Sequence, residues 1–115
     1  MVKEGAHARE GEVLRAEAMW LQAAGRTREA LAVSQQLLAQ LREDPELTTK
    51  YEIVDALERV RTLAAGLDPD VCLAAGQRLT ALWESMQRVH PQSELVAARY
   101  GQAKAAPPEA CAVHD

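Results

Sequence analysis

Turn-forming residues divide this chain into segments of similar length, and this punctuation constrains the fold more than any other feature. Glycine stands at positions 25 and 66, and proline at 45, 69 and 91. Glycine adopts the left-handed conformation that ends helices, and proline cannot donate a hydrogen bond within one. Between these breaks, apolar residues recur at steps of three and four, the spacing of one helix face. No segment alternates with period two over a useful length, so the sequence predicts an all-α fold.

The breaks and the apolar periods also set the expected helices, which span 9–24, 27–43, 46–66, 69–89 and 93–103. The clearest start is "LDPDV", where Asp68 can cap a helix and Pro69 fits its first position. Gly25 should end the first helix, and Thr27 should cap the second. The short connections favour antiparallel neighbours.

Outside the periodic region the sequence has no helical pattern. Residues 1–8 show no apolar period, and residues 105–115 read "AAPPEACAVHD", rich in proline and small residues. We therefore expect one helical domain at 9–104, preceded by a flexible N-terminus and followed by a disordered tail. Two cysteines do not form a disulfide framework. We expect Cys72 and Cys111 to be reduced thiols, with Cys72 acting as a small core side chain.

Charge and composition argue against several functional classes. Thirteen basic and seventeen acidic residues give a net charge of −4, and neither sign forms a block that could follow a phosphate backbone. We therefore expect no nucleic acid partner. The N-terminus lacks the apolar core of a signal peptide, and no run approaches the roughly 18 apolar residues that cross a bilayer. We expect a cytoplasmic protein with no membrane partner.

Motifs for catalysis and for metal or cofactor binding are missing from the sequence. It has no glycine-rich phosphate loop and no nucleophile or metalloprotease motif. The three histidines and two cysteines lack the spacing of a zinc site. We therefore expect no enzymatic activity, no cofactor and no metal.

The first pair of expected helices carries the residues of a known repeat. Leu14, Ala18, Leu21, Gly25 and Ala30 fall on pattern positions of the tetratricopeptide repeat, and "GRTREAL" resembles its turn. Two helices that cross closely need small side chains at the contact, which Ala18 and Ala30 supply. Residues 10–104 thus resemble a divergent tetratricopeptide protein of about two and a half units. The resemblance implies antiparallel hairpins stacked as a short right-handed solenoid, with the fifth helix as a C-terminal cap.

The resemblance also implies a function and a site. In that family, ligands lie in a groove lined by the first helix of each hairpin. The corresponding positions of the first helix here are Glu12, Arg15, Met19 and Gln22. Arg15 can pair with a carboxylate, and Met19 can adapt to an apolar side chain. We expect a non-catalytic adaptor or chaperone-like module that binds a peptide or helix of another protein.

A self-associating structural or regulatory bundle is the alternative, because repeat proteins need roughly three units to bury a continuous core. A polar outer face on the fifth helix would cap a monomer, whereas uncovered Leu95, Val96 and Tyr100 would favour a homodimer. We expect Trp83 in the core. Trp20 is also expected there, with an exposed anchor for a partner as the other interpretation.

Overall fold

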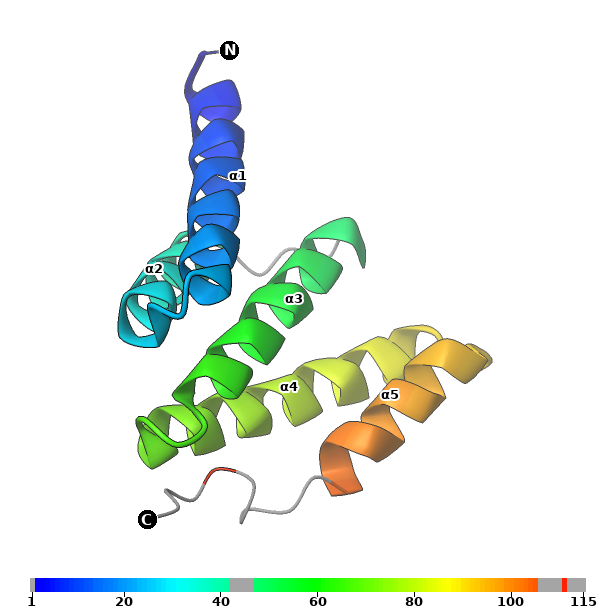
Figure 1. Ribbon diagram of the computed structural model, residues 1–115. Coiled ribbons are helices and arrows are strands. Elements are labelled where there is room, and N and C mark those ends of the chain that lie inside the picture. Colours follow the sequence, from blue (N-terminus) through cyan, green and yellow to red (C-terminus); the bar gives the residue numbers. More distant parts are fainter. Residues whose placement is uncertain (1, 42–46, 106–110, 112–115) are drawn as a thin grey trace.

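The chain folds into a stack of α-helices, shown in Figure 1. The computed structural model describes residues 2–41, 47–105 and 111. The helices are α1 (Val2–Ala23), α2 (Thr27–Gln40), α3 (Leu47–Ala64), α4 (Pro69–Val89) and α5 (Glu94–Ala105). The described residues include no strand, and successive helices pack as stacked hairpins, which confirms the all-α prediction. The expected break at Pro45 and most of the expected tail lie outside the described residues.

Helix boundaries agree with the sequence except at the N-terminus. Helix α4 has the predicted limits, and α2, α3 and α5 end or begin within three residues of theirs. The helix expected to begin at Arg9 begins at Val2 instead. The apolar period reports a helix face that packs on a neighbour. Alanine, glutamate, lysine and arginine favour helix on their own, so a helix can extend beyond its packed region.

The two tight turns are made by glycines, as predicted. Gly25 has φ of 78° and Gly66 has φ of 87°, a region that other residues rarely adopt. After α1, the amide of Arg26 donates to the carbonyl of Leu21 (2.9 Å), and that of Gly25 donates to Gln22 (3.1 Å). This pair of bonds is the Schellman motif, which satisfies the last carbonyls of the helix.

Side-chain caps mark the starts of α4 and α5. Asp68 accepts a hydrogen bond from the amide of Val71, and Ser93 accepts one from the amide of Val96, both at 3.2 Å. The prediction that Thr27 caps α2 is wrong. Arg26 occupies the cap position without a side-chain cap bond, because α2 begins directly after the Schellman turn and includes Thr27 as its first residue. Its guanidinium instead binds the Glu29 carboxylate.

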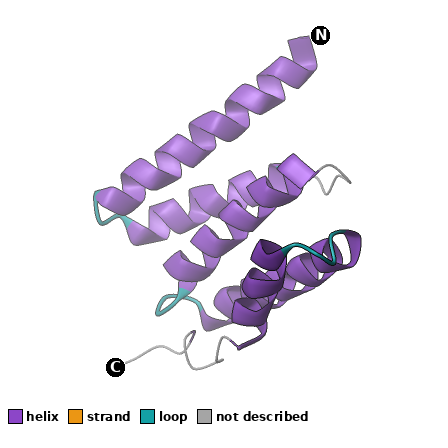
Figure 2. Ribbon diagram, turned by 90° about the vertical axis from the view of Figure 1, so that its right-hand side faces the viewer, coloured by secondary structure: helices purple, strands orange, loops and turns teal. Residues whose placement is uncertain are grey.

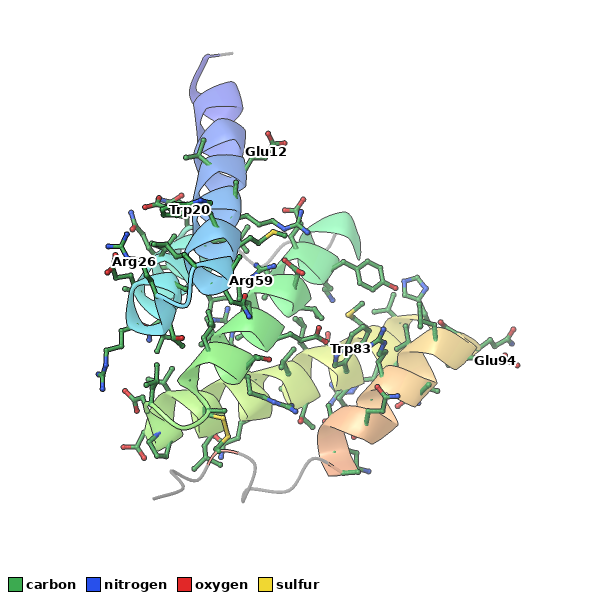
Figure 3. The ribbon with its side chains drawn as sticks, in the orientation of Figure 1. Glu12, Trp20, Arg26, Arg59, Trp83 and Glu94 are labelled. Atoms are coloured by element: carbon green, nitrogen blue, oxygen red, sulfur yellow. A yellow bond between two sulfur atoms is a disulfide. The ribbon has the colours of Figure 1, made fainter. Side chains whose placement is uncertain are left out.

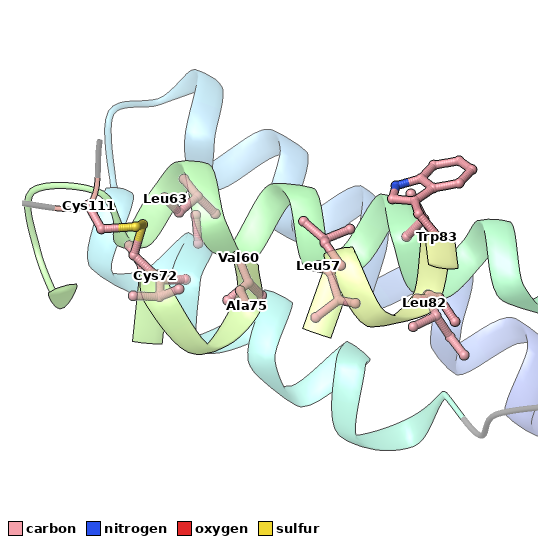
Figure 4. Close-up of a cluster of buried hydrophobic side chains, with 14 of the residues drawn as sticks. Leu57, Val60, Leu63, Cys72, Ala75, Leu82, Trp83 and Cys111 are labelled. Atoms are coloured by element: carbon pink, nitrogen blue, oxygen red, sulfur yellow. A yellow bond between two sulfur atoms is a disulfide. The ribbon is translucent and has the colours of Figure 1, made fainter. Parts of the chain in front are cut away.

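Each helix packs on the helix before it and the one after it, which gives the layered stack seen in Figure 2. The molecule measures 48 × 40 × 20 Å. The core follows the stack and is dominated by the side chains of α3 and α4. In Figure 4, Leu57, Val60 and Leu63 of α3 lie close to Ala75 and Cys72 of α4. Ile53 and Met86 are fully buried.

Burial confirms part of the predicted core. Ala18, Leu21 and Ala30 are buried where α1 meets α2, and Trp83 is buried in α4. The core placement of Trp20 is wrong, because its side chain is 63% exposed. Trp20 follows Ala18 by two residues, which turns it about 200° away from the face that packs on α2. Val13, Tyr51 and Val89 are also exposed, although each is a large apolar residue within a helix.

The expectation of two reduced thiols is wrong as well. Cys72 and Cys111 form a disulfide between residues 39 apart in the sequence. Cys72 is a core residue as predicted, and Cys111 is buried beside it. The bond depends on where the segment after α5 returns to the stack, which no local sequence pattern reports.

The buried contact at Ala30 generates a first prediction. Ala30→Leu should destabilise the protein by about 1–3 kcal/mol, because a larger side chain at this helix crossing must displace α1 from α2. Thermal unfolding followed by circular dichroism measures the change. Ala32→Leu is the matched control, since Ala32 is exposed on the same helix. Equal melting temperatures for both variants would show that Ala30 has room for a larger side chain.

A second prediction concerns Ser34, whose hydroxyl is buried in α2 without a hydrogen-bond partner. Ser34→Ala should raise the free energy of unfolding by about 1 kcal/mol, because it removes an unsatisfied polar group from the core. Ser93→Ala should lower it by about 1 kcal/mol through loss of the α5 cap. Denaturant unfolding compares the two. A less stable Ser34→Ala protein would contradict the assignment.

Candidate functional site

The predicted site residues lie on the exposed surface of α1. Glu12, Arg15, Met19 and Gln22 are all exposed. The Arg15 guanidinium forms an ion pair with the Asp55 carboxylate of α3 at 3.3 Å, so this side of α1 faces α3. Glu12 extends toward the same side in Figure 3. The four residues therefore border the surface formed by α1 and α3, which begin the first two hairpins.

Asp55 links two arginines on that surface. It pairs with Arg15 of α1 and, at 3.2 Å, with Arg59 one turn along α3. The Arg59 side chain is only 11% exposed, whereas that of Arg15 is 57% exposed. Arg15 thus pairs with a carboxylate of its own chain. None of the four predicted residues lines either of the two grooves described below.

A groove between α3 and α5 lies on the side of the stack formed by the first helix of each hairpin. We call it the α3–α5 groove; it encloses about 260 Å³. Its floor is formed by Leu79 and Trp83 of α4, both buried. The walls come from α3 and α5, and consist of Glu58, Arg61, Thr62, Arg99, Gln102 and Ala103. Typical small-molecule pockets enclose about 300–1,000 Å³, so this volume suits a single protein side chain.

Two arginines dominate the electrostatics of this groove. Arg61 lies on the α3 wall and Arg99 on the α5 wall, and neither forms an ion pair with any described residue. Among the described residues of the lining, Glu58 is the only acidic one. These described residues therefore carry a net positive charge, on a chain whose net charge is −4. Such a pair of guanidiniums favours an anionic group, because each can bind a carboxylate through two parallel hydrogen bonds.

Contacts with α4 position the residues of the groove. The Arg61 side chain crosses α4 at Gly76, where a Cβ would lie 3.7 Å from its Cδ. The ring of Trp83 packs against that of Tyr51, with centroids 6.1 Å apart in an edge-to-face arrangement. Lys50 of α3 donates to Ser85 of α4 at 3.3 Å. The floor and the α3 wall are therefore held as one unit, whereas the α5 wall belongs to a separate helix.

Sequence analysis did not single out Arg61 or Arg99. Each is one of several arginines on a helix, and only the stacking of α3 and α5 on α4 brings them to one groove. The resemblance pointed instead to the first helix of each hairpin. It pointed to α1, where Arg15 is already paired.

A second groove lies on the opposite pair of helices, α2 and α4, and has a different chemistry. This α2–α4 groove encloses about 380 Å³ over Leu57 and Val60 of α3. Its walls are mostly apolar and are formed by Gln35, Leu38, Ala39, Val71, Ala74, Ala75 and Arg78. In its described lining, Gln35 and Arg78 are the two residues with polar side chains.

The described part of the chain shows neither a metal site nor a membrane-spanning helix. There, no three histidine, cysteine, aspartate or glutamate side chains lie close enough together to hold a metal ion. Likewise, none of the described helices is both long and apolar enough to cross a membrane. The α3–α5 groove is therefore the candidate functional site.

Comparisons with protein-family models, with curated proteins and with solved structures each found no match. The tetratricopeptide resemblance consequently remains a prediction from the residues of the first hairpin. The function has to be argued from the chemistry of the groove itself.

Proposed function

We propose that the chain is a non-catalytic protein-binding module. In this proposal a peptide or helix of a partner protein binds along the side formed by α1, α3 and α5. The α3–α5 groove receives an acidic side chain of that partner. The observation that carries the proposal is the presence of Arg61 and Arg99 on opposite walls of one groove, neither of them in an ion pair with a described residue.

The chemistry of the groove supports this ligand. Two guanidiniums can bind one carboxylate from both sides, and such charge-assisted bonds are the strong ones in proteins. Leu79 and Trp83 on the floor offer apolar surface to the methylene groups of the same side chain. The described residues of the lining include no histidine or cysteine, so they offer no pairing of a nucleophile with an imidazole base. Binding without chemistry is the function that these residues favour.

The α1 surface extends the same proposal. Glu12, Arg15, Met19 and Gln22 would contact residues of the partner beyond the groove. To bind a carboxylate of the partner, Arg15 would have to break its ion pair with Asp55. Asp55 would retain its ion pair with Arg59. We therefore expect the α1 residues to contribute less to affinity than Arg61 and Arg99. The proposed compartment is the cytoplasm.

Peptide binding tests the proposal directly. A positional-scanning library would compare peptides that carry Asp or Glu with matched peptides that carry Asn or Gln at the same position. Only the peptides with the acidic residue should bind. Arg61→Gln and Arg99→Gln should each lower the affinity for the tightest-binding labelled peptide about 10- to 100-fold, because each removes a charged hydrogen bond. Fluorescence anisotropy measures this affinity. Arg15→Glu should weaken it less.

Arg88→Gln is the matched control, because Arg88 is exposed on α4 and paired with Glu84 away from the groove. Its affinity should equal that of the wild type. A library without binders, or binders that tolerate both groove substitutions, would refute the proposed function.

Self-association is the second candidate, and one observation favours it. Val13 and Trp20 lie seven residues apart, on one face of α1, and are 62% and 63% exposed. On α5, by contrast, Val96 is buried and Tyr100 is half-buried against α4, which leaves Leu95 exposed. The face of α5 that the sequence offered for dimerisation is thus largely used within the chain.

Sedimentation separates the two candidates. The proposed module should be a monomer at micromolar concentration, as wild type and as Trp20→Glu, because the groove needs no second copy. A wild-type dimer that Trp20→Glu converts to a monomer would instead support self-association through α1. Leu95→Glu serves as the control for α5.

A further inference from the structure

Helix α5 has few contacts that hold it in place. It packs on α4 and shows no comparable packing on any other described helix. Val96 is its one buried side chain, and Tyr100 and Ala103 are partly buried against the core. The remaining side chains of its outer face are exposed. Because the apolar area buried by α5 is small, its docking on α4 is weak without further support.

The Cys72–Cys111 disulfide supplies that support. Cys72 lies in the second turn of α4, and Cys111 follows the last residue of α5 by six positions. Cys111 is buried in the core cluster that contains Leu63 and Cys72, and Figure 4 shows it beside both. The bond therefore anchors the chain on both sides of α5: α4 precedes it, and the fixed Cys111 follows it. A helix tethered at both ends re-docks far more readily than one that ends freely.

The groove depends on this helix. Arg99, Gln102 and Ala103 form the α5 wall; Arg99 lies at the middle of α5, and Gln102 and Ala103 lie in the half nearest Cys111. If α5 leaves α4, the groove loses one of its two arginines, and Leu79 and Trp83 become exposed. The opposite wall would remain, because α3 is packed between α2 and α4.

We propose that the Cys72–Cys111 bond is a redox-sensitive strap that keeps α5 docked and the α3–α5 groove formed, so that reduction of the bond lowers affinity for the acidic ligand. This regulation rests on the binding function proposed above. In a cytoplasm kept reducing by thiol systems, a protein disulfide is transient. The groove would then be complete under oxidising conditions and incomplete under reducing ones.

The chemistry of the switch is thiol–disulfide exchange with a dithiol reductant. A reductant thiolate attacks one sulfur, forms a mixed disulfide and releases the other cysteine as a thiolate, which takes up a proton. The second thiol of the reductant then displaces the first cysteine, so the reductant ends as a disulfide and the protein holds two thiols. Cys111 is 6% exposed and Cys72 is 1% exposed, which makes the Cys111 sulfur the more accessible point of attack.

Hydrogen exchange measured by mass spectrometry tests the strap without any ligand. The full chain is compared after air oxidation and after reduction with dithiothreitol. We expect the amides of residues 97–105 in α5 to exchange at least tenfold faster after reduction, with those of α2 unchanged. Cys111→Ser should show the fast exchange in both conditions. Ser93→Ala is the matched control: it weakens the α5 cap yet keeps the disulfide, and should retain its response to reduction.

Three results would overturn the proposal: free thiols in the air-oxidised protein, α5 exchange that reduction leaves within twofold, or an equal increase in α2 and α5. Anisotropy with the acidic peptide separates this proposal from the binding function. Tight binding that reduction does not weaken overturns the strap and keeps the function. Faster α5 exchange without any peptide binding supports the strap as a structural device and refutes the function.

Discussion

The burial of α3 on two sides is the interaction on which the rest of the structure depends. Its apolar residues Ile53, Leu57 and Val60 are buried between α2 and α4, and these contacts hold the first hairpin to the second. The interhelical ion pair and both grooves include a residue of this helix. Asp55 receives Arg15 from α1, Arg61 forms a wall of the α3–α5 groove, and Leu57 lies below the α2–α4 groove. Loss of packing around α3 would therefore remove both grooves together.

Stability is distributed unevenly from this centre to the ends of the stack. Helices α2, α3 and α4 bury several side chains each, whereas α5 buries only Val96. The end of the chain is held by a covalent bond in place of a large apolar contact. Peripheral elements of this kind open at a lower free energy than the core does. The proposed site is built across this boundary, because its α3 wall belongs to the stable part and its α5 wall does not.

The two grooves differ in what they can bind because they lie over different residues of the same stack. The α2–α4 groove exposes mainly aliphatic side chains, with Gln35 and Arg78 as the polar residues of its described lining. The α3–α5 groove combines apolar floor residues with Arg61 and Arg99. A guanidinium attracts an anion more strongly in a partly desolvated groove than at an open surface, because less water screens the two charges. This difference makes the α3–α5 groove the more selective of the two.

The sequence by itself determined the helices and their turns. Gly25, Gly66 and the Asp68–Pro69 pair act through the local backbone, and their roles follow from conformational preferences and caps that do not depend on distant residues. The same holds for Ala30, because helical spacing places it on the buried face of α2.

Only the tertiary structure decided which side chains meet. Arg61 and Arg99 come together because α3 and α5 both pack on α4, and Cys72 meets Cys111 because the chain returns to the start of α4 after α5. Trp20 is exposed because none of the described helices covers the outer face of α1, although its residue type favours burial. Local patterns encode the direction of a side chain relative to its own helix. Whether a neighbour lies in that direction depends on how helices distant in the sequence stack, and this is fixed by the sum of their packing contacts.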